Sequence, residues 1–306
     1  MSHRNKQVSF TSSLTGHRAM TRRGFLTLAG TASALALLGC EKDSEPSGDT
    51  GTTDAASGDL SGTKLTFVGD DAFAPYRLVQ VTDDGGQKVV GLDIAVADEM
   101  ARRLGFTYDF EPQDFSATLA SLQGSDASFT MAMSSNPERE QTYDFTRGYY
   151  QPLVGVLTLG DKIESVDALA DLSIACTTGT VQNKFVLAVA PNADIHTYDG
   201  GDQCLQEVLA GRVQAYVCDG AEGLAMQQAN PDTVIGFLPR EQTSDYVGVY
   251  RIMAKKGASF VSAFDACVGE MLNDGTLDAL IAQWVGEDFV WGASTADAGM
   301  STVAAG

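Results

Sequence analysis

The chain has 306 residues, of which 44% are hydrophobic, and its 20 Lys and Arg residues stand against 40 Asp and Glu residues. Such a length suffices for one large domain or two smaller lobes. Only five basic residues and no acidic residue lie in the first 39 positions, so the rest of the chain has 15 basic and 40 acidic residues and a formal charge of −25. So acidic a surface repels phosphate backbones, which argues against nucleic-acid binding.

The first predicted element is an export signal over residues 1–39. Arg22 and Arg23 lead directly into an apolar run, Phe25 to Leu38, that is broken only by small residues. The run is too short for a permanent bilayer-spanning helix, which needs about 20 apolar residues. The paired arginines are typical of a twin-arginine signal. A buried core helix is the alternative, but a polar stretch of small residues follows at once, which favours the signal.

The end of the apolar run, Leu37-Leu38-Gly39-Cys40, resembles a lipobox, although Leu38 is bulkier than the usual residue at its position. Cys40 would then carry the lipid, and several acyl chains on one cysteine give stable anchoring to a membrane surface. The rest of residues 40–63 is mostly Gly, Ser, Thr and Asp, which predicts a flexible linker. These features predict an extracytoplasmic protein that is lipid-anchored to a bacterial membrane.

Strands alternate with helices from residue 64 onward, which predicts a parallel sheet. The expected elements are a strand at 64–68, a helix that follows Gly91-Leu92-Asp93, a strand at 106–110, a helix at 116–122 and a strand at 128–133. In the first helix, apolar residues from Ile94 to Leu104 fall on one face at steps of three and four. Asp93 is its expected N-cap, and Gly105 its expected stop.

The same alternation restarts at Ser165, which predicts a second sheet. The expected elements are a short helix at 167–172, a strand at 174–176, a helix at 182–189, a helix around 205–209, a strand at 213–218 that ends in Asp219, a strand at 248–253, a helix at 260–272 and a helix around 277–284. The last stretch, residues 293–306, is small and polar and is expected to be a disordered tail.

Cysteine and histidine usage limits the chemistry of the chain. Beside Cys40 there are four cysteines, Cys176, Cys204, Cys218 and Cys267. An even number permits disulfides in an oxidising compartment, whereas a twin-arginine route exports folded chains and makes buried free thiols the alternative. Only His196 lies beyond residue 39, which argues against histidine triads and multi-histidine metal sites. We therefore expect neither a metal nor a cofactor.

The order of elements, and a series of short motifs, are similar to the family 3 extracellular solute-binding proteins, which deliver polar amino acids to ABC importers. The motifs run in order along the chain: Asp70-x-x-Phe73-Ala74-Pro75-Tyr76, Val90-Gly91-Leu92-Asp93, Arg103-Leu104-Gly105, Asp114-Phe115, Asn136-Pro137-Glu138-Arg139, Asp144-Phe145, Tyr149-Tyr150, Thr178-Gly179-Thr180, Gly211-Arg212-Val213 and Asp274-Gly275-Thr276. The site pattern is most similar to that of glutamine-binding proteins.

The resemblance implies an α/β, two-lobed fold of the type II periplasmic-binding-protein class, with a parallel-rich sheet flanked by helices in each lobe. The first lobe would comprise residues 64–155 plus 252–292, and the second lobe residues 156–251. The two chain crossings would form a two-strand hinge, and a ligand bound in the cleft would favour the closed state. The protein is expected to act as a monomer with the membrane subunits of an ABC permease.

The resemblance also implies a site for a zwitterion. Arg139 is similar to the family arginine that clamps the α-carboxylate, a role that suits its bidentate fork. Its alternative role is a surface salt bridge with Glu138 or Glu140. Asp219 resembles the acid that receives the α-ammonium group, and its alternative role is the N-cap of a helix that begins near Ala221.

Other positions would complete the site. Phe73 and Phe115 match two aromatics that sandwich the ligand, although either could be a core residue. The other residues that match binding positions are Ser134, the carbonyl of Ala132, the amides of Thr180 and Val181, and Thr177, which stands where glutamine receptors present a lysine. Tyr76 matches a position that packs below the site.

Asp70 would line the cleft and add an acceptor that the ligand's backbone groups do not neutralise. A side chain that donates hydrogen bonds is then favoured, with glutamine first and lysine, arginine or histidine next. A second hypothesis is a periplasmic cyclohexadienyl or arogenate dehydratase, which would need a positioned general acid. A third is a sensory module, which usually carries an output domain.

Overall fold

We describe the fold from a computed structural model that places residues 58–290. The predicted export signal (1–39), the predicted lipidation site Cys40 and the predicted tail (293–306) lie outside the described residues. The linker expected over residues 40–63 ends earlier than predicted. Leu60 packs against the core of the first lobe, and its N–H donates to the carbonyl of Leu104 at 2.7 Å. An apolar side chain thus ties the chain down before the first strand begins.

The first lobe is built on a five-stranded sheet of order β5-β1-β6-β13-β7. Its strands are β1 (Lys64–Gly69), β5 (Thr107–Pro112), β6 (Ser128–Met133), β7 (Tyr143–Phe145) and β13 (Arg251–Lys255). β1 runs parallel to β5 and β6, whereas β13 runs antiparallel to β6 and β7. Its helices are α1 (Leu92–Leu104), α2 (Phe115–Gly124), α7 (Val261–Asn273) and α8 (Thr276–Trp284), with 3-10 turns at Arg139–Gln141 and Glu287–Phe289.

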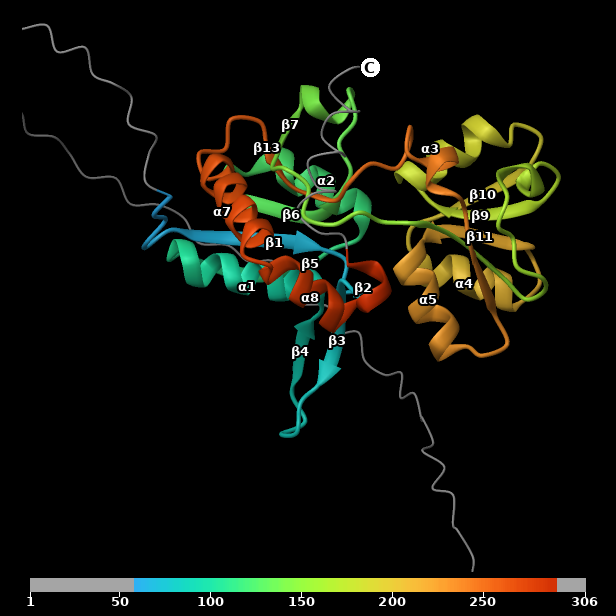
Figure 1. Cartoon of the computed structure of the whole chain (residues 1–306), viewed down its shortest axis with the longest axis horizontal. Helices are drawn as coiled ribbons and strands as arrows, with labels where there is room; N and C mark the ends of the chain where they lie inside the picture. Colours follow the sequence, from blue (N-terminus) through green and yellow to red (C-terminus); the bar gives the residue numbers. More distant parts are fainter. Residues whose placement is uncertain (1–57, 291–306) are drawn as a thin grey trace, which may run out of the picture. The chain divides into compact units, whose positions relative to one another are not determined.

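The two faces of this sheet are covered by different helices, as alternating side chains on a strand require. Phe67 of β1 points into an aromatic core that it shares with Phe129, at a ring distance of 4.9 Å, and with buried residues of α1, α7 and α8. Those three helices contact one another (Figure 1). The next residue, Val68, packs instead with Leu122 of α2. β1 is therefore buried on both sides.

α1 begins one residue earlier than its expected cap, and Asp93 is not its N-cap. Gly91, at φ 132°, precedes the helix, and an added Cβ there would lie 2.3 Å from the carbonyl oxygen of Tyr76. Asp93 is fully buried and forms an ion pair with Arg77. The Asp93 carboxylate therefore pairs with an arginine from a preceding strand instead of accepting from the backbone amides at the start of α1. Gly105 caps the C-terminus at φ 79°, which confirms the expected stop.

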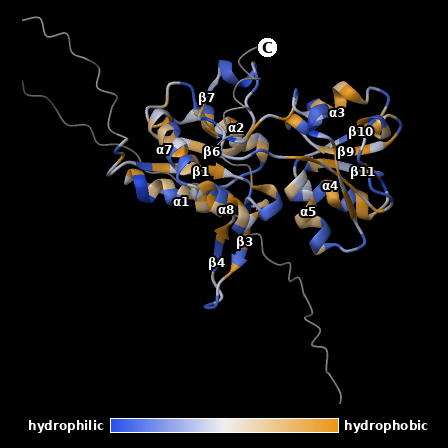
Figure 2. Ribbon diagram, in the orientation of Figure 1, coloured by the Kyte–Doolittle hydropathy of each residue, from blue (hydrophilic) through white to orange (hydrophobic). Residues whose placement is uncertain are grey.

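Between β1 and α1 the chain forms a small antiparallel sheet that the alternating pattern does not reveal. It consists of β2 (Ala72–Phe73), β3 (Arg77–Val81) and β4 (Gln87–Val90). In Figure 1 the β3–β4 hairpin projects from the first lobe, and in Figure 2 its turn is hydrophilic. At the end of this small sheet that adjoins the first lobe, Phe73 and Tyr76 pack against the core of that lobe and Arg77 pairs with Asp93.

The second lobe has its own five-stranded sheet, of order β10-β9-β11-β8-β12. Its strands are β8 (Val154–Thr158), β9 (Ser173–Thr177), β10 (Asp194–Tyr198), β11 (Ala215–Asp219) and β12 (Val234–Phe237). Its helices are α3 (Val181–Val189), α4 (Gly201–Leu209), α5 (Gly220–Ala229) and α6 (Arg240–Thr243), and a 3-10 turn at Val166–Leu169 replaces the short helix expected at 167–172. α3 packs on one face, and α4 and α5 on the other. Figure 2 shows hydrophobic residues concentrated on these strands.

The chain passes between the lobes twice, and the two passages are hydrogen-bonded to each other. The N–H of Tyr149 donates to Tyr250 O at 2.8 Å, and the N–H of Tyr250 donates to Tyr150 O at 2.7 Å. The sheets divide the chain before Val154 and before Arg251, two residues and one residue earlier than the expected boundaries.

The four cysteines beyond Cys40 are buried and unpaired, so the alternative of free thiols describes this structure. Cys176, Cys204 and Cys218 belong to the core of the second lobe, and Cys267 to that of the first. Burial raises the pKa of the Cys176 and Cys204 thiols to about 12. These side chains act as small hydrophobic residues.

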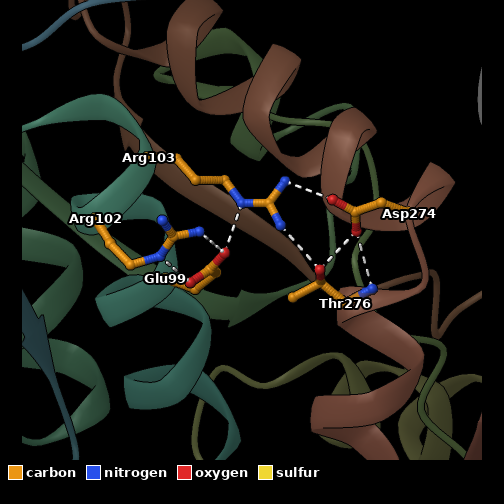
Figure 3. Close-up of polar contacts among 5 residues, drawn as sticks. All are labelled: Glu99, Arg102, Arg103, Asp274 and Thr276. Carbon is orange, nitrogen blue, oxygen red and sulfur yellow. Dashed lines mark hydrogen bonds and ion pairs between the residues drawn. The ribbon is translucent and has the colours of Figure 1, made fainter.

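An arginine network ties the end of α1 to the turn between α7 and α8 (Figure 3). Arg103 forms ion pairs of 2.7 Å with Glu99 and 2.8 Å with Asp274, and donates to Thr276 Oγ1 at 2.8 Å. Side-chain hydrogen bonds, chiefly from Arg102 to Glu99 and from Thr276 to Asp274, with Arg103 adding to both, hold the pKa of these two carboxyls near 2. The network fastens the C-terminal helices of the first lobe to α1.

Candidate functional site

One cavity takes its lining from both lobes and contains about 780 Å³ of empty space, its open mouth included. All ten candidate ligand residues lie in its lining: Asp70, Phe73, Phe115, Ala132, Ser134, Arg139, Thr177, Thr180, Val181 and Asp219. The sequence motifs, which are up to 150 residues apart, therefore converge on a single place.

The position of the cavity follows from strand direction. β1 ends at Gly69 and β6 at Met133 in the first lobe, and β9 ends at Thr177 and β11 at Asp219 in the second. The site residues stand at or just beyond these ends. Ligands of α/β sheets bind at the carboxyl ends of the strands, where loops can present side chains without breaking the sheet.

Arg139 lies on the 3-10 turn that follows β6, with its half-buried guanidinium over the face of Phe115 at 5.6 Å from the ring centre. Nη1 donates to the carbonyl of Ser134 at 2.8 Å, and Nη2 approaches the carbonyl of Gly179 in the second lobe at 3.4 Å. Within residues 58–290 no salt bridge involves Arg139, and Glu138 pairs instead with Lys184. The alternative of a surface ion pair is therefore not what the structure has.

Asp219 is buried, and four groups donate hydrogen bonds to its carboxylate. Oδ1 accepts from Tyr76 Oη at 2.9 Å and from the N–H groups of Ala221 and Glu222 at 2.9 and 3.0 Å, while Oδ2 accepts from Tyr250 Oη at 2.9 Å. Asp219 is thus the N-cap of α5, as the alternative reading held, and it lines the cavity as well. Oδ2, with a single donor, is the oxygen that retains acceptor capacity.

The carboxyls of this region are held in a poorly solvated environment. Burial raises the pKa of Asp219 to about 6 against the opposing effect of its hydrogen bonds. Glu222 is 6% exposed, and burial followed by the charge of Asp219 raises its pKa well above the ordinary value. The second-lobe side of the cavity therefore favours a positive charge.

The two aromatic candidates line the cavity and also pack on core residues. Phe73 stacks near Tyr76 at a ring distance of 4.8 Å, and Phe115 joins the cluster around Leu122. The Arg77 guanidinium lies 5.2 Å from the centre of the Phe73 ring, and its charge is balanced by Asp93. These contacts fix ring orientations before any ligand arrives.

Ala132 has a left-handed backbone, with φ 58°, which is unusual for a residue with a Cβ. Three steps along β6, from Thr130 to Met133, match only two steps along β13, so the ladder has a β-bulge here. A bulge leaves one residue outside the regular pairing and redirects its peptide groups. The bulge supplies a structural reason for a backbone carbonyl at Ala132 to face the cavity rather than a neighbouring strand.

The remaining candidates present backbone and hydroxyl groups. Thr180 is the N-cap of α3, and its Oγ1 accepts from the N–H of Asn183 at 3.1 Å. The Thr180 N–H itself donates to the carbonyl of Thr177 at 3.3 Å, so at the start of α3 the amides of Val181 and Gln182 are the ones left for a ligand. Thr177 Oγ1 lies 3.3 Å from Tyr216 Oη. Ser134 Oγ already donates to the carbonyl of Gly248 at 2.8 Å, so it can offer a ligand only its lone pairs.

Several residues that line the cavity were not predicted from the sequence. They are Arg77, Thr118, Gln182, Tyr216, Glu222 and Tyr250. Glu222 could have been noticed because it follows Asp219 by three positions, a spacing that places two residues on the same side of a helical turn. Tyr76 is the residue whose position, below the site, was foreseen, although its hydrogen bond to Asp219 was not.

A second hollow adjoins the first and shares Asp70 and Gly201 with it. Five aspartates contribute to its lining: Asp70, Asp71, Asp114, Asp199 and Asp202. In the described part of the chain, no group of three or more acidic, histidine or cysteine residues is placed to hold a metal ion. The aspartates instead surround one side of the cavity with negative charge, which attracts cationic solutes.

Comparison with known proteins agrees with this geometry. The model of the bacterial extracellular solute-binding proteins, family 3, matches residues 65–287. The L-cystine-binding protein TcyJ of Escherichia coli is 27% identical over 214 residues, which cover 67% of this chain and 77% of TcyJ. The arginine-binding extracellular protein ArtP of Bacillus subtilis is 23% identical over 233 residues, covering 74% and 89% of the two chains.

An ancestral arginine-binding protein bound to arginine superposes with a TM-score of 0.64 at 27% identity, over 73% of this chain and 98% of that one. A structure of an ancestral arginine-binding protein bound to glutamine gives a TM-score of 0.64 at 28% identity, over 73% of this chain and 98% of that one. These relatives and structural neighbours are two-lobed binding proteins rather than enzymes. Among residues 58–290, no helix combines the length and the apolar character needed to cross a bilayer.

Proposed function

Because this chain belongs to family 3 of the bacterial extracellular solute-binding proteins, we propose that it captures a polar amino acid in the interlobe cavity for an ABC importer. The observation that carries the proposal is the contrast between the two sides of that cavity. Arg139, without an ion-pair partner among residues 58–290, lines it together with the buried carboxylate of Asp219. A zwitterion presents a carboxylate and an ammonium group and so matches both charges.

The α-carboxylate would be bound by Arg139 and the amides at the start of α3, and the α-ammonium group by Asp219 Oδ2. Phe73 and Phe115 would enclose the aliphatic part of the ligand. Asp70 favours a side chain that donates hydrogen bonds, so glutamine and the basic amino acids are the preferred ligands. Cystine, the ligand in the name of TcyJ, is the neutral competitor that a binding panel must include.

The lobes would close on the ligand by bending at the paired segments around Tyr150 and Tyr250, which form the two connections between the sheets. Contacts from one lobe to the other, such as Glu138 with Lys184 and Arg139 with Gly179 O, would be remade during this motion. The closed form is the one that a permease would recognise. A ligand stabilises that form only to the extent that it binds it more tightly than the open form.

We further propose that residues 1–39 direct export through the twin-arginine route and that Cys40 is lipidated. The support is the sequence alone, since both lie outside the described residues. Cys40→Ser should move the exported protein from the detergent phase to the aqueous phase in a phase-partition assay. Detergent partitioning that survives in Cys40→Ser would contradict the lipid anchor.

Titration calorimetry tests the central proposal. The purified protein is titrated with the twenty amino acids and cystine, and with prephenate as the substrate that the dehydratase hypothesis requires. At least one polar amino acid should bind more tightly than about 100 μM, which corresponds to about 5.5 kcal/mol. Absence of any such ligand, or turnover of prephenate, would contradict the proposal.

A further inference from the structure

Glu222 lies in the lining of the cavity and is 94% buried, and few hydrogen-bond donors surround its carboxyl. Among residues 58–290, Tyr216 Oη is the only group outside the backbone of Glu222 itself that donates a hydrogen bond to this carboxyl. It lies 3.3 and 3.2 Å from the two carboxylate oxygens. Both distances are at the long end of the range for O–H···O bonds. No salt bridge involves Glu222 in this part of the chain, and the two arginines of the lining are engaged with Asp93 and with backbone carbonyls.

The charged groups of residues 58–290 that act most strongly on Glu222 are acidic. Asp219 acts from the end of β11, Asp70 from the end of β1 and Asp202 from the first turn of α4, and each disfavours a second negative charge at Glu222. The neighbouring phenols of Tyr216 and Tyr250 and the thiols of Cys204 and Cys218 have pKa values raised chiefly by burial, so they are neutral near pH 7. Within the described range 58–290, therefore, no residue supplies the positive charge that a buried carboxylate requires.

The backbone nevertheless makes room for this side chain. Gly201 begins α4 directly against Glu222, and an added Cβ there would lie 2.1 Å from Glu222 Oε1. Gly201 also lines both the main cavity and the adjoining acidic hollow. The carboxyl thus sits where the cavity meets a surface with five aspartates, on the opposite lobe from Arg139.

We propose that Glu222 determines specificity by binding a cationic ligand side chain, so that the ligand is a basic amino acid. This inference rests on the proposed function and narrows it. The α-carboxylate at Arg139 and a guanidinium or ammonium group at Glu222, with Asp70 nearby, would place one charge of each sign at the two sides of the cavity. The neutral carboxamide of glutamine leaves the carboxyl without a counter-charge.

Proton binding at Glu222 should depend on the charge of the ligand. Because burial and the three aspartates raise the pKa of Glu222, the protonated form of this carboxyl is favoured when no ligand is bound. An arriving cation favours the carboxylate, so a basic amino acid should displace that proton to solvent as it binds. A neutral ligand of the same shape should not.

The test compares L-arginine with L-citrulline, which has a neutral ureido group in place of the guanidinium, in the wild type and in Glu222→Gln. The wild type should prefer arginine by at least tenfold, and Glu222→Gln should lower that preference at least tenfold while citrulline affinity changes less than threefold. Glu241→Gln, the loss of an exposed carboxylate elsewhere in the second lobe, should leave the preference unchanged. Titrations in two buffers of different ionisation enthalpy near pH 7 should show proton release with arginine that is absent in Glu222→Gln.

Two results would overturn the inference while the proposed function stands. The first is an arginine preference that Glu222→Gln does not reduce, and the second is a wild-type protein that binds glutamine or cystine more tightly than arginine and lysine. A wild type that binds no amino acid would overturn the proposed function, and this inference with it.

Discussion

Tyr76 donates a hydrogen bond of 2.9 Å to Asp219 Oδ1 and thereby joins the β2–β3 region of the first lobe to the end of β11 in the second. Both residues are buried, with Tyr76 fully inaccessible. Hydrogen bonds to charged groups contribute more than neutral ones, and a buried acceptor that loses its donor is costly.

Tyr76→Phe should therefore lower the free energy of unfolding by about 1–3 kcal/mol. The measurement is urea-induced unfolding followed by circular dichroism. Tyr246→Phe is the matched control, since Tyr246 is 40% exposed and its ring packs on Phe185. It should change stability by less than about 0.5 kcal/mol. Equal effects of the two substitutions would contradict the importance given to the bond.

Three buried carboxyls make the stability of the ligand-free protein depend on pH. Burial raises the pKa of Asp93 and of Asp219 to about 6, and that of Glu222 well above its ordinary value. A raised pKa means that the folded protein holds the proton more tightly than the unfolded chain. Their stabilising effect is therefore complete below the ordinary carboxyl pKa of about 4 and is lost as the pH rises through the raised values.

Unfolding should consequently become easier between about pH 4.5 and 7.5, by an amount on the order of 1–3 kcal/mol each for Asp93 and Asp219. Glu99 and Asp274, whose pKa values are near 2, act in the opposite direction but below this window. Glu222→Gln should be more stable than the wild type at pH 7.5 and should have a shallower pH dependence. A variant with the wild-type slope in urea unfolding across this range would contradict the environment assigned to Glu222.

Arg103 and Arg102 provide a matched pair on α1, since both contact Glu99 but only Arg103 reaches Asp274 (Figure 3). The Arg103 side chain is 17% exposed and that of Arg102 is 70% exposed. Arg103→Ala should reduce the free energy of unfolding by about 1–3 kcal/mol, and Arg102→Ala by less than about 0.5 kcal/mol. Thermal unfolding that ranks the two variants in the reverse order would contradict this account of the network.

The clamp on the α-carboxylate can be tested from the ligand side. The methyl ester of L-arginine has lost the anionic carboxylate and has gained net positive charge, which the acidic cavity attracts. We nevertheless expect the ester to bind at least about tenfold more weakly than the free amino acid, because a charge-assisted fork contributes more than 1.4 kcal/mol. Competition calorimetry measures the ratio. An ester that binds as tightly as the acid would show that the carboxylate is not held.

The sequence predicted the order of elements because each rests on local periodicity. Strands such as β1 and β6 and the stop of α1 at Gly105 are set by alternation and by glycine, and the structure has them within a few residues. In the second lobe β8, β10 and β12 were missed. β10 and β12 are the two edge strands, and β8 lies between β11 and β12, with both of which it pairs antiparallel. The role of Asp93 was wrong because its partner, Arg77, comes from a hairpin that local pattern did not predict.

The sequence predicted which residues belong to the candidate site, but it did not predict the contacts among them. Arg139 and Asp219 were found through motifs, whereas the phenol of Tyr250 that bonds Asp219 comes from a chain crossing 31 residues further along. Glu222 was missed because a glutamate in the first turn of a helix is ordinarily a solvated residue that interacts with the helix dipole. Only the approach of α4 at Gly201 and the neighbouring aspartates reveal its burial.

The affinity of Arg139→Ala for the tightest-binding amino acid of the wild type is the most direct test of the claim that this cavity holds a zwitterion. Calorimetry should find it weakened at least about 30-fold, equivalent to about 2 kcal/mol, because no other cation of the lining is free to take the carboxylate. Arg212→Ala, which removes an exposed arginine paired with Glu207, should bind as the wild type does. An unchanged affinity in Arg139→Ala would contradict the site described here.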